Sequence, residues 1–448
     1  MLPRVALSPP QLLRSMALSP SRHAAPVLTE RCFVAELAGS ELVYFTCWSG
    51  SGPPAPGGSV RPRGFLPRPG RCYSFCIDAA QSLRERVRAA RLHKQLQQKL
   101  SQAPFGAGCQ VLPLLSYCPT DAAAAPEKGF LVQVAQAAPE TERSLEELLR
   151  LHLPAPAHLC VYQEAEDGQL WRALWRLKGA AEGKERLGRA RVVTAPRPDR
   201  HPAASHLLDG AVFCSREAAR RVLEECMALI PEAKAVLDLV DKCPDLPKKG
   251  DFPVIVIEGL DATGKTTVTQ SLKDSLNAIL LRSPPSCVSQ WRKTFDDEPT
   301  LIRRAFYALT NYIVASEIAK ESTKSPVIID RYFHSTAAYA IATEISGKVS
   351  DLPPLHHPVY CWPKDLLKPD LVILLTVSPE ERIRRLQGRG AEKTREEAEL
   401  EVNSFFRQKV EESYRRMENP SCQLVDASRS REEVFENVLH QIKKHFPS

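Results

Sequence analysis

The sequence predicts two halves of different architecture. Residues 250–448 are expected to form a three-layer α/β fold with a mostly parallel sheet, and residues 30–245 an α+β domain. The first observation is a β-branched run at 254–257, which is typical of a buried parallel strand. A glycine-rich loop at 259–266 follows it directly, and apolar residues at near-helical spacing begin at Val268. Strand, glycine loop and helix in this order indicate a nucleotide-binding α/β sheet.

The glycine-rich loop fits the pattern G-x-x-x-x-G-K-[ST]. Glycines let backbone N–H groups approach phosphate oxygens without a Cβ in the way, and the following helix directs its positive end at the same place. In this pattern Lys265 holds the β- and γ-phosphates of ATP, and the Thr266 hydroxyl ligates Mg²⁺. We therefore expect the ATP phosphates to meet Gly259, Leu260, Asp261, Ala262, Thr263, Gly264, Lys265, Thr266 and Thr267.

Composition limits the classes of protein to consider. The 448 residues exceed one domain of the usual ~100–200 residues. The net charge of +7 is spread along the chain, and no dense Lys/Arg block with interleaved aromatics is evident, so we expect no nucleic-acid partner. No apolar run approaches the ~18 residues of a membrane helix, so no membrane span is expected. The 13 cysteines, an odd and scattered set, favour reduced thiols in an intracellular protein.

The first 29 residues differ from the rest. They contain arginines and serines but no acidic residue, and the first acid is Glu30. Such a start resembles a mitochondrial transit peptide, which predicts the mitochondrial matrix as the location. Its prolines disfavour a single amphipathic helix, and a disordered N-terminus without a targeting role is the alternative.

The N-terminal half carries no recognisable catalytic pattern. Trp171 and Trp175 are four residues apart, which predicts one helix face packed into a core. The half could be a regulatory or interaction module, or an extension packed on the C-terminal half, with 242–251 as linker. Strand-like pieces are 32–37, 42–46, 72–77, 111–116 and 129–134; helical ones are 83–100, 144–151 and 215–240, the last broken near Pro231.

The C-terminal half continues with further strands that end in polar residues. Leu280 and Leu281 form a short strand ending at Arg282, and a long helix is expected over 302–321. The β-branched run 327–329 ends in Asp330, which places a carboxylate at the sheet edge near Mg²⁺ or its water. Alternatively, Asp330 caps the next helix.

A basic loop between two helices comes next. The strand 371–377 precedes a helix that starts with a Ser-Pro-Glu-Glu cap at Ser378 and stops at Gly388. One helix with an apolar stripe is expected over 398–417, followed by a strand at 423–425 and a closing helix. The loop suits a lid over phosphates; a solvated charged face is the alternative. Candidate lid arginines are Arg384, Arg385 and Arg389.

Together these motifs resemble the thymidylate kinase family of P-loop nucleoside-monophosphate kinases, over about residues 250–448. The resemblance rests on Glu258-Gly259-Leu260-Asp261, Gly264-Lys265-Thr266-Thr267, Asp330-Arg331-Tyr332 with Ser335 and Tyr339, and Pro369-Asp370-Leu371 through Pro379-Glu380-Glu381-Arg382. It implies that Asp261 meets the acceptor sugar, Asp330 the metal and transferred phosphate, and Arg331 the acceptor phosphate. It also implies that substrate is bound by Arg282, Tyr307, Asn311, Tyr312, Ser335 and Tyr339, and it suggests a homodimer through helices near 302–321.

Two departures from the family pattern affect these expectations. Some members place a basic residue directly after the loop acid, where this chain has Ala262, so the transition-state cation should come from the lid. The thymine-reading arginine is replaced by Asn311 and Tyr312, which fits acceptors such as UMP, CMP, dUMP and dCMP. The activity implied is transfer of the ATP γ-phosphoryl, with Mg²⁺, to a pyrimidine nucleoside monophosphate. The alternatives are a nucleotide-dependent interaction protein with weak ATPase activity and a kinase of unphosphorylated nucleosides.

Overall fold

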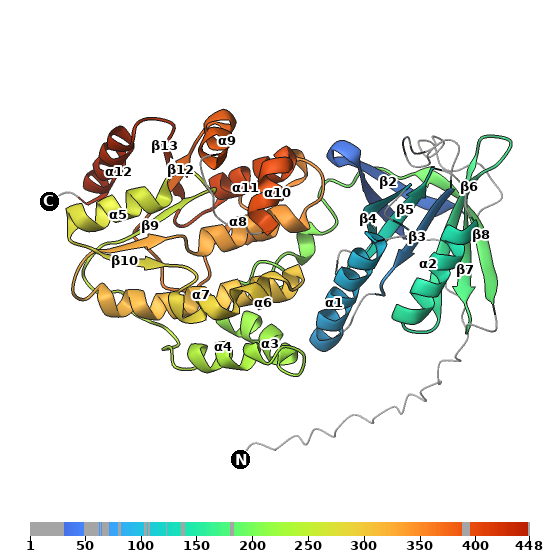
Figure 1. Cartoon of the computed structure of the whole chain (residues 1–448), viewed down its shortest axis with the longest axis horizontal. Coiled ribbons are helices and arrows are strands. Elements are labelled where there is room, and N and C mark those ends of the chain that lie inside the picture. Colours follow the sequence, from blue (N-terminus) through green and yellow to red (C-terminus); the bar gives the residue numbers. More distant parts are fainter. Residues whose placement is uncertain are drawn as a thin grey trace, which may run out of the picture.

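The computed structural model describes residues 31–48, 62, 64, 71–78, 82–102, 105, 108–121, 123–135, 139–179, 183–387 and 395–446. The transit-like segment 1–29 and most of the basic loop, Arg389 included, lie outside the described residues. Two bodies lie side by side: a helix-covered sheet from the C-terminal half and a barrel from the N-terminal half (Figure 1). Among the described helices, none has the length and apolarity needed to cross a membrane.

The C-terminal sheet has five strands in the order β10-β11-β9-β12-β13, and every pairing is parallel. The sequence predicted all five strands, and the P-loop strand occupies the centre. The carboxyl ends of all five therefore meet at one edge. The strands are β9 Val254–Gly259, β10 Ile279–Arg282, β11 Val327–Asp330, β12 Leu371–Thr376 and β13 Cys422–Asp426.

Helices cover both faces of this sheet, which confirms the layered α/β prediction. Along β9, Val254 and Val256 pack on one side and Ile255 and Ile257 on the other, as alternation along a strand requires. The first side meets α7 (Thr300–Glu321), α8 (Phe333–Glu344) and α11 (Ser404–Arg416). The second meets α5 (Lys265–Leu276) and α12 (Arg431–His445).

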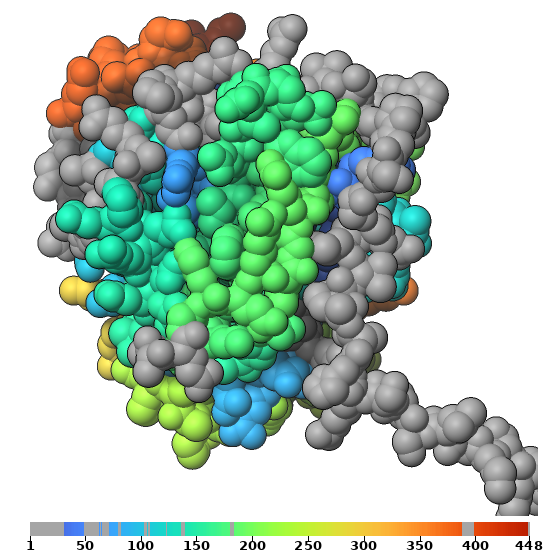
Figure 2. All heavy atoms as spheres, turned by 90° about the vertical axis from the view of Figure 1, so that its right-hand side faces the viewer, coloured from blue at the N-terminus to red at the C-terminus, as the bar shows by residue number. Residues whose placement is uncertain are grey.

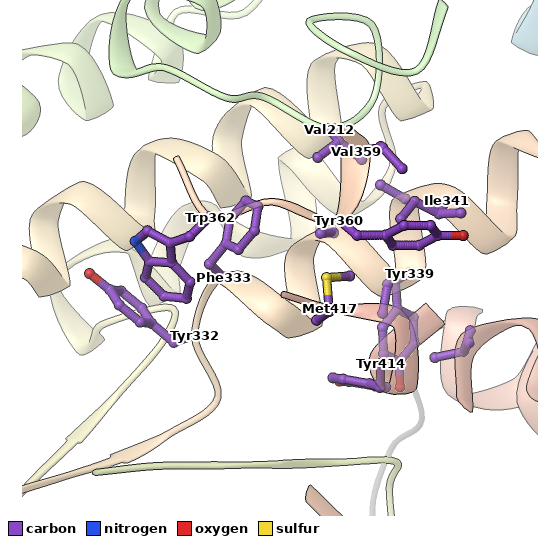
Figure 3. Packing of buried hydrophobic residues seen from close by; sticks show 14 of the residues in the cluster. Val212, Tyr332, Phe333, Tyr339, Ile341, Val359, Tyr360, Trp362, Tyr414 and Met417 are labelled. Atoms are coloured by element: carbon purple, nitrogen blue, oxygen red, sulfur yellow. The ribbon is translucent and has the colours of Figure 1, made fainter. Parts of the chain in front are cut away.

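Aromatic side chains fill much of the layer between α8 and α11. Tyr332, Phe333 and Trp362 form one group, with Phe333 and Trp362 ring centroids 5.1 Å apart (Figure 3). Tyr339 and Tyr414 lie on the facing helices. Each fully buried side chain of this size contributes about 1.5–3 kcal/mol to the free energy of folding because it is removed from water. This layer therefore holds α8 firmly against the sheet.

The single helix expected over 398–417 is two helices. The first is α10 (Arg395–Val402), and α11 begins after Asn403, whose side chain accepts a hydrogen bond from the Phe406 N–H at 2.9 Å. An N-cap of this kind ends one helix and starts another with a new direction. Val402, placed in the expected apolar stripe, is 87% exposed because the break turns it to solvent. The preceding helix, α9, spans Pro379–Gln387.

The N-terminal half is a closed barrel of eight strands, in the order β1-β2-β8-β7-β6-β3-β5-β4, and all its pairings are antiparallel. Two helices, α1 (Leu83–Leu100) and α2 (Pro139–His152), pack on its outside. The sequence predicted an α+β domain and five of these strands, but not the closure. The strands are β1 Cys32–Leu37, β2 Glu41–Trp48, β3 Arg71–Cys76, β4 Cys109–Tyr117, β5 Glu127–Val134, β6 Ala157–Glu164, β7 Leu170–Leu177 and β8 Lys184–Thr194.

The prediction of a helix at Trp171 and Trp175 is wrong, because both residues lie on strand β7. A spacing of four is also two periods of a strand, so it puts both indoles on one face of a sheet. Leu170 belongs to the barrel interior, which leaves the tryptophans on the outside. The cysteines, by contrast, match their prediction: all 13 are free thiols.

The two halves are joined by packing and by ion pairs. Helices α3 (Arg216–Cys226) and α4 (Glu232–Val240) share a hydrophobic cluster with α7. This contact buries much of the helix through which a homodimer was expected. Ion pairs between the halves are Lys128–Glu344 at 2.6 Å, Arg91–Glu298 at 3.2 Å and Arg197–Asp351 at 2.6 Å.

Candidate active site

A cavity of about 300 Å³ opens at the carboxyl ends of β9, β10 and β11. The ends of parallel strands are where open α/β sheets bind ligands. The sequence named most of the residues that line it: Asp261, Ala262, Gly264, Lys265, Thr266, Arg282, Tyr307, Asp330, Arg331, Ser335 and Tyr339. The cavity is also lined by residues that were not predicted as site residues: Ser283, Pro284, Arg292, Arg304, Tyr332 and Thr336.

The glycine-rich loop has the backbone that the motif requires. Gly259 and Gly264 have φ of 143° and 91°, in the region that favours glycine. A Cβ on Gly259 would lie 2.6 Å from the Leu375 carbonyl oxygen of the neighbouring strand, so a larger residue does not fit. Helix α5 begins at Lys265, which places its N-terminal N–H groups at the cavity.

Lys265 is buried beside the loop. Its Nζ donates a hydrogen bond to the Leu260 carbonyl oxygen at 2.6 Å. Burial and the nearby Arg331 lower the pKa of Lys265 to about 8, although Asp261 and Asp330 oppose the change. A phosphate group at the loop would supply the negative charge that stabilises the ammonium form.

Asp330 supplies an acidic group at the end of β11. Its Oδ2 lies 3.5 Å from Arg282 Nη2, a contact from the end of one strand to the end of the next. Its Oδ1 is buried and has no hydrogen-bond partner among the described residues. A buried carboxylate oxygen of this kind is a suitable ligand for a hard cation such as Mg²⁺. The exposed Thr266 lines the same cavity, so both residues predicted to hold the metal fit that role.

Arg331 connects the acid of the P-loop, Asp261, to the first turn of helix α8. Its φ of 67° turns the chain sharply after β11. The guanidinium donates to Asp261 Oδ1 at 2.6 Å, to the Gly259 carbonyl oxygen at 2.9 Å and to Ser335 Oγ at 3.2 Å. Burial alone would lower the pKa of Arg331, but Asp261, Tyr339, Tyr414 and Glu258 together outweigh it and hold the pKa above its usual value. Arg331, expected at the acceptor phosphate, and Asp261, expected at the acceptor sugar, are therefore paired with each other in this structure.

Glu258 holds the turn at Arg331 by hydrogen bonds to the residues that follow it, a role that the sequence did not reveal. Its fully buried carboxylate accepts hydrogen bonds from the Tyr332 N–H at 2.9 Å, the Ser335 N–H at 3.2 Å and the Ser335 hydroxyl. Burial raises the pKa of Glu258, while the Ser335 hydroxyl and Arg331 act in the opposite direction. The position at the end of a strand was a signal, but nothing in the pattern indicated its partners.

The wall opposite the loop is built from α7 and α8. Asn311 is buried; its side chain accepts from Ser283 Oγ at 2.7 Å and donates to Thr336 Oγ1 at 3.1 Å. These two partners line the cavity, whereas Asn311 itself lies behind them. Tyr307 lines the cavity and donates its hydroxyl to Asp296 at 2.6 Å.

Tyr312 does not line the cavity. Its hydroxyl donates to Asp365 Oδ1 at 2.7 Å, and its ring is buried in the core on the other side of α7. One residue along a helix is a turn of about 100°, so neighbouring residues such as Asn311 and Tyr312 face different surroundings. The structure thus separates the two residues that the sequence grouped as base readers.

Of the candidate lid arginines, Arg385 contacts the glycine-rich loop. It donates to the Ala427 carbonyl oxygen at 2.7 Å and the Ala262 carbonyl oxygen at 3.4 Å, and pairs with Glu381 at 2.6 Å. Arg384 also pairs with Glu381, at 2.7 Å, but its side chain is 74% exposed. The buried Arg382, which the sequence assigned only to the family motif, donates to the Asp261 carbonyl oxygen at 3.2 Å.

The chain is similar to several known proteins. A model of the thymidylate kinase family matches residues 257–438. The human protein "UMP-CMP kinase 2, mitochondrial" is 57% identical over 431 residues, which cover 94% of each chain. The thymidylate kinase structure from Candida albicans is 19% identical, covers 43% of this chain and 92% of its own, and has a TM-score of 0.34. Deoxyadenosine kinase from M. mycoides with bound dATP is 16% identical, with coverages of 42% and 99% and a TM-score of 0.31.

The two structural likenesses are too weak to carry an argument, because both TM-scores lie below 0.5. The match to the human protein is different in kind, since it extends over both halves of the chain at high identity. The family match spans the P-loop and the Asp-Arg-Tyr turn, which line the cavity, and also α9, whose Arg385 contacts the P-loop. The chain therefore belongs to the thymidylate kinase family and is an ATP-dependent nucleoside-monophosphate kinase.

Proposed function

We propose that this kinase transfers the γ-phosphoryl group of ATP to pyrimidine nucleoside monophosphates, namely UMP, CMP, dUMP and dCMP. The observation that carries the proposal is the shared cavity. It combines a phosphate-binding loop at Lys265 with a second cationic group, Arg331, at the neighbouring strand end. Two such groups on one cavity suit a donor and an acceptor that both carry phosphate.

In this proposal the donor is held by the loop and α5. Backbone N–H groups between Gly259 and Thr266 bind the phosphates, and Lys265 leaves the Leu260 carbonyl to contact the β- and γ-phosphates. Because Lys265 is buried, its attraction to the transferred group is screened little by water. The residues that would hold Mg²⁺ are Thr266 and Asp330, and the ion would neutralise charge developing on the transferred phosphoryl group.

The acceptor is held on the side of Arg331. A monophosphate would compete with Asp261 for the guanidinium, and Asp261 would then be released towards the acceptor sugar. Arg282 lies 3.5 Å from Asp330 at the same edge, where it would add a second positive charge. Catalysis is then positioning of two phosphates together with stabilisation of charge, with no covalent step on the protein.

The base is read on the wall formed by α7 and α8. Ser283 and Thr336 both line the cavity and are held by Asn311, so their hydroxyl groups have fixed orientations. Tyr307 offers an aromatic face on the same wall. Hydroxyls fixed in this way suit the donor and acceptor groups on the Watson–Crick edge of a uracil or cytosine ring. The name of the human relative, which is 57% identical, supports this acceptor and a mitochondrial location, and we place the protein in the matrix.

The test is a coupled assay of ADP release by the purified protein with ATP and Mg²⁺. Acceptors are UMP, CMP, dUMP, dCMP, dTMP and AMP, with cytidine as the matched unphosphorylated control. We expect turnover with the uridine and cytidine monophosphates and none with cytidine, because Arg331 requires a phosphate. Turnover with cytidine equal to that with CMP would contradict the role of Arg331, and preference for dTMP or AMP would contradict the pyrimidine assignment.

A further inference from the structure

A surface of the barrel far from the kinase cavity carries alternating aromatic and basic side chains. It lies over strands β6, β7 and β8, and Figure 2 faces it, with β7 and β8 in green. Trp171 on β7 is directly opposite Arg191 on β8, and Arg191 is opposite Trp48 on β2. Residues directly opposite in antiparallel strands point to the same face, so these three side chains form one row.

Two more rows lie beside the first. Arg189 is opposite Ala173, and Arg186 is opposite Trp175. Leu170, Leu174 and Ala190 point into the barrel, which places the alternate residues outside. We name the outward set the Trp–Arg face; its residues are Trp48, Trp171, Trp175, Arg186, Arg189 and Arg191.

Cations already stack on the indoles of this face. The Arg189 guanidinium lies 4.2 Å from the centre of the Trp171 ring, and Lys184 Nζ lies 4.9 Å from that of Trp175. The stacking holds the rings and the arginine in a defined arrangement beside a shallow groove of about 290 Å³. Trp171, Trp175, Arg186 and Arg189 line that groove.

No acidic residue that the structure describes neutralises the arginines of the face. Arg186, Arg189 and Arg191 form no ion pair with the residues that the structure describes. The one acidic residue of the groove, Glu142, already binds Arg71 at 3.3 Å and Lys184. The groove therefore presents positive charge next to flat aromatic surfaces.

We propose that the Trp–Arg face binds single-stranded nucleic acid. Such a strand is a polyanion whose bases stack on aromatic side chains, and proteins that bind it combine a cationic groove with stacking platforms. An anionic membrane fits less well, because insertion needs exposed aliphatic residues. Among the described residues of the barrel and its two helices, 31–194, the large exposed hydrophobic residues are Trp48 and, at the end of α2, Leu151.

This site is separate from the kinase reaction, and no sequence pattern predicted it. Its arginines alternate with interior residues on β8 and form no dense basic block. Placing the tryptophans on a helix also hid the rows, because register across strands is what brings them beside the arginines.

The test measures fluorescence anisotropy of labelled single strands, oligouridylate and oligothymidylate of about 20 nucleotides, with the full-length protein. ATP and Mg²⁺ are present at saturation so that the P-loop is filled. Three phosphate contacts predict a slope of log affinity against log salt of about −2, or roughly twentyfold weaker binding between about 50 and 200 mM salt.

Variants separate a specific face from general positive charge. Trp171→Ala should weaken binding at least about fivefold, the lower end for one base stack. Arg189→Ala should weaken it and reduce the salt slope by about 0.7. The matched control is Arg88→Ala, which removes one exposed arginine from α1. Kinase turnover should be unchanged in all three, which shows that they are folded.

The proposal is supported if both face variants bind weakly while Arg88→Ala binds like the unmodified protein. It is overturned if no binding occurs at low salt, or if Arg88→Ala loses as much as Arg189→Ala. It is also overturned if vesicles containing phosphatidylserine bind more tightly than the strands and lose binding in the same variants.

Discussion

Replacing Glu258 by glutamine tests how the turn that carries Arg331 is held. The carboxylate accepts three short hydrogen bonds, from the N–H groups of Tyr332 and Ser335 and from the Ser335 hydroxyl, and a longer one from the Tyr414 hydroxyl at 3.4 Å. Glutamine has the same shape and can keep both N–H bonds on its oxygen, while its NH₂ faces the Ser335 and Tyr414 hydroxyls. The two N–H bonds survive, and the Ser335 hydroxyl has to turn so that it accepts from the NH₂ instead of donating; all of these bonds lose the charge that strengthens them.

The size of the effect follows from these bonds. A hydrogen bond to a charged group contributes about 1.5–3 kcal/mol and a neutral one about 0.5–1.5. The three short bonds would thus contribute about 3 kcal/mol less to the free energy of unfolding. Part of this loss is recovered because glutamine, unlike glutamate, buries no charge. We expect the free energy of unfolding to fall by about 1–3 kcal/mol. We also expect the KM for the acceptor to rise about tenfold, since the turn positions Arg331, with a smaller change in kcat.

Urea unfolding and steady-state kinetics measure the two effects. Glu321→Gln is the matched control: it removes a carboxylate at the end of α7, where Glu321 pairs with Lys324 at 3.1 Å. If Glu258→Gln leaves both the unfolding free energy and the acceptor KM within the range of this control, Glu258 does not hold the turn. A rise in the KM for ATP alone would also refute the reasoning, because Glu258 contacts the acceptor side.

Three further outcomes follow from the loop and the lid. Lys265→Ala should lower kcat by about a thousandfold or more while circular dichroism stays unchanged; near-normal turnover in a folded variant would remove Lys265 from the mechanism. Since the pKa of Lys265 is lowered to about 8, its ammonium form is lost as pH rises through that value. ATP affinity, measured by calorimetry, should therefore fall about tenfold between about pH 7 and pH 9, and the fall should be absent in Lys265→Arg. Arg385→Met should reduce kcat/KM for ATP more than Arg384→Met does, because only Arg385 contacts the Ala262 carbonyl; equal effects would contradict this difference.

Local patterns predicted the C-terminal sheet because its signals are short-range. A β-branched run followed by a glycine loop determines β9 and α5, and the next two runs end in Arg282 and Asp330, which line the cavity. The helix break at Asn403 was missed because an asparagine can also occur inside a continuous helix. Only the structure shows that its side chain accepts a hydrogen bond from the Phe406 N–H and so starts a new helix.

Long-range features could not be predicted in this way. Barrel closure depends on pairing β1 with β4, far apart in sequence. One of the missed strands, β8, begins with charged residues and contains Arg186, Arg189 and Arg191, and so lacks the apolar run that indicates a buried strand. The links from Glu258 to Ser335 and from Asn311 to Ser283 join different elements, so only the folded chain reveals them.

The central claim is that one cavity brings a donor and an acceptor phosphate together. The most direct measurement follows the label from γ-³²P-ATP with CMP as acceptor, separating nucleoside diphosphate from free phosphate. The account predicts that the label appears in CDP, and that formation of free phosphate without CMP is far slower. Release of label only as free phosphate, at a rate that CMP does not change, would contradict it.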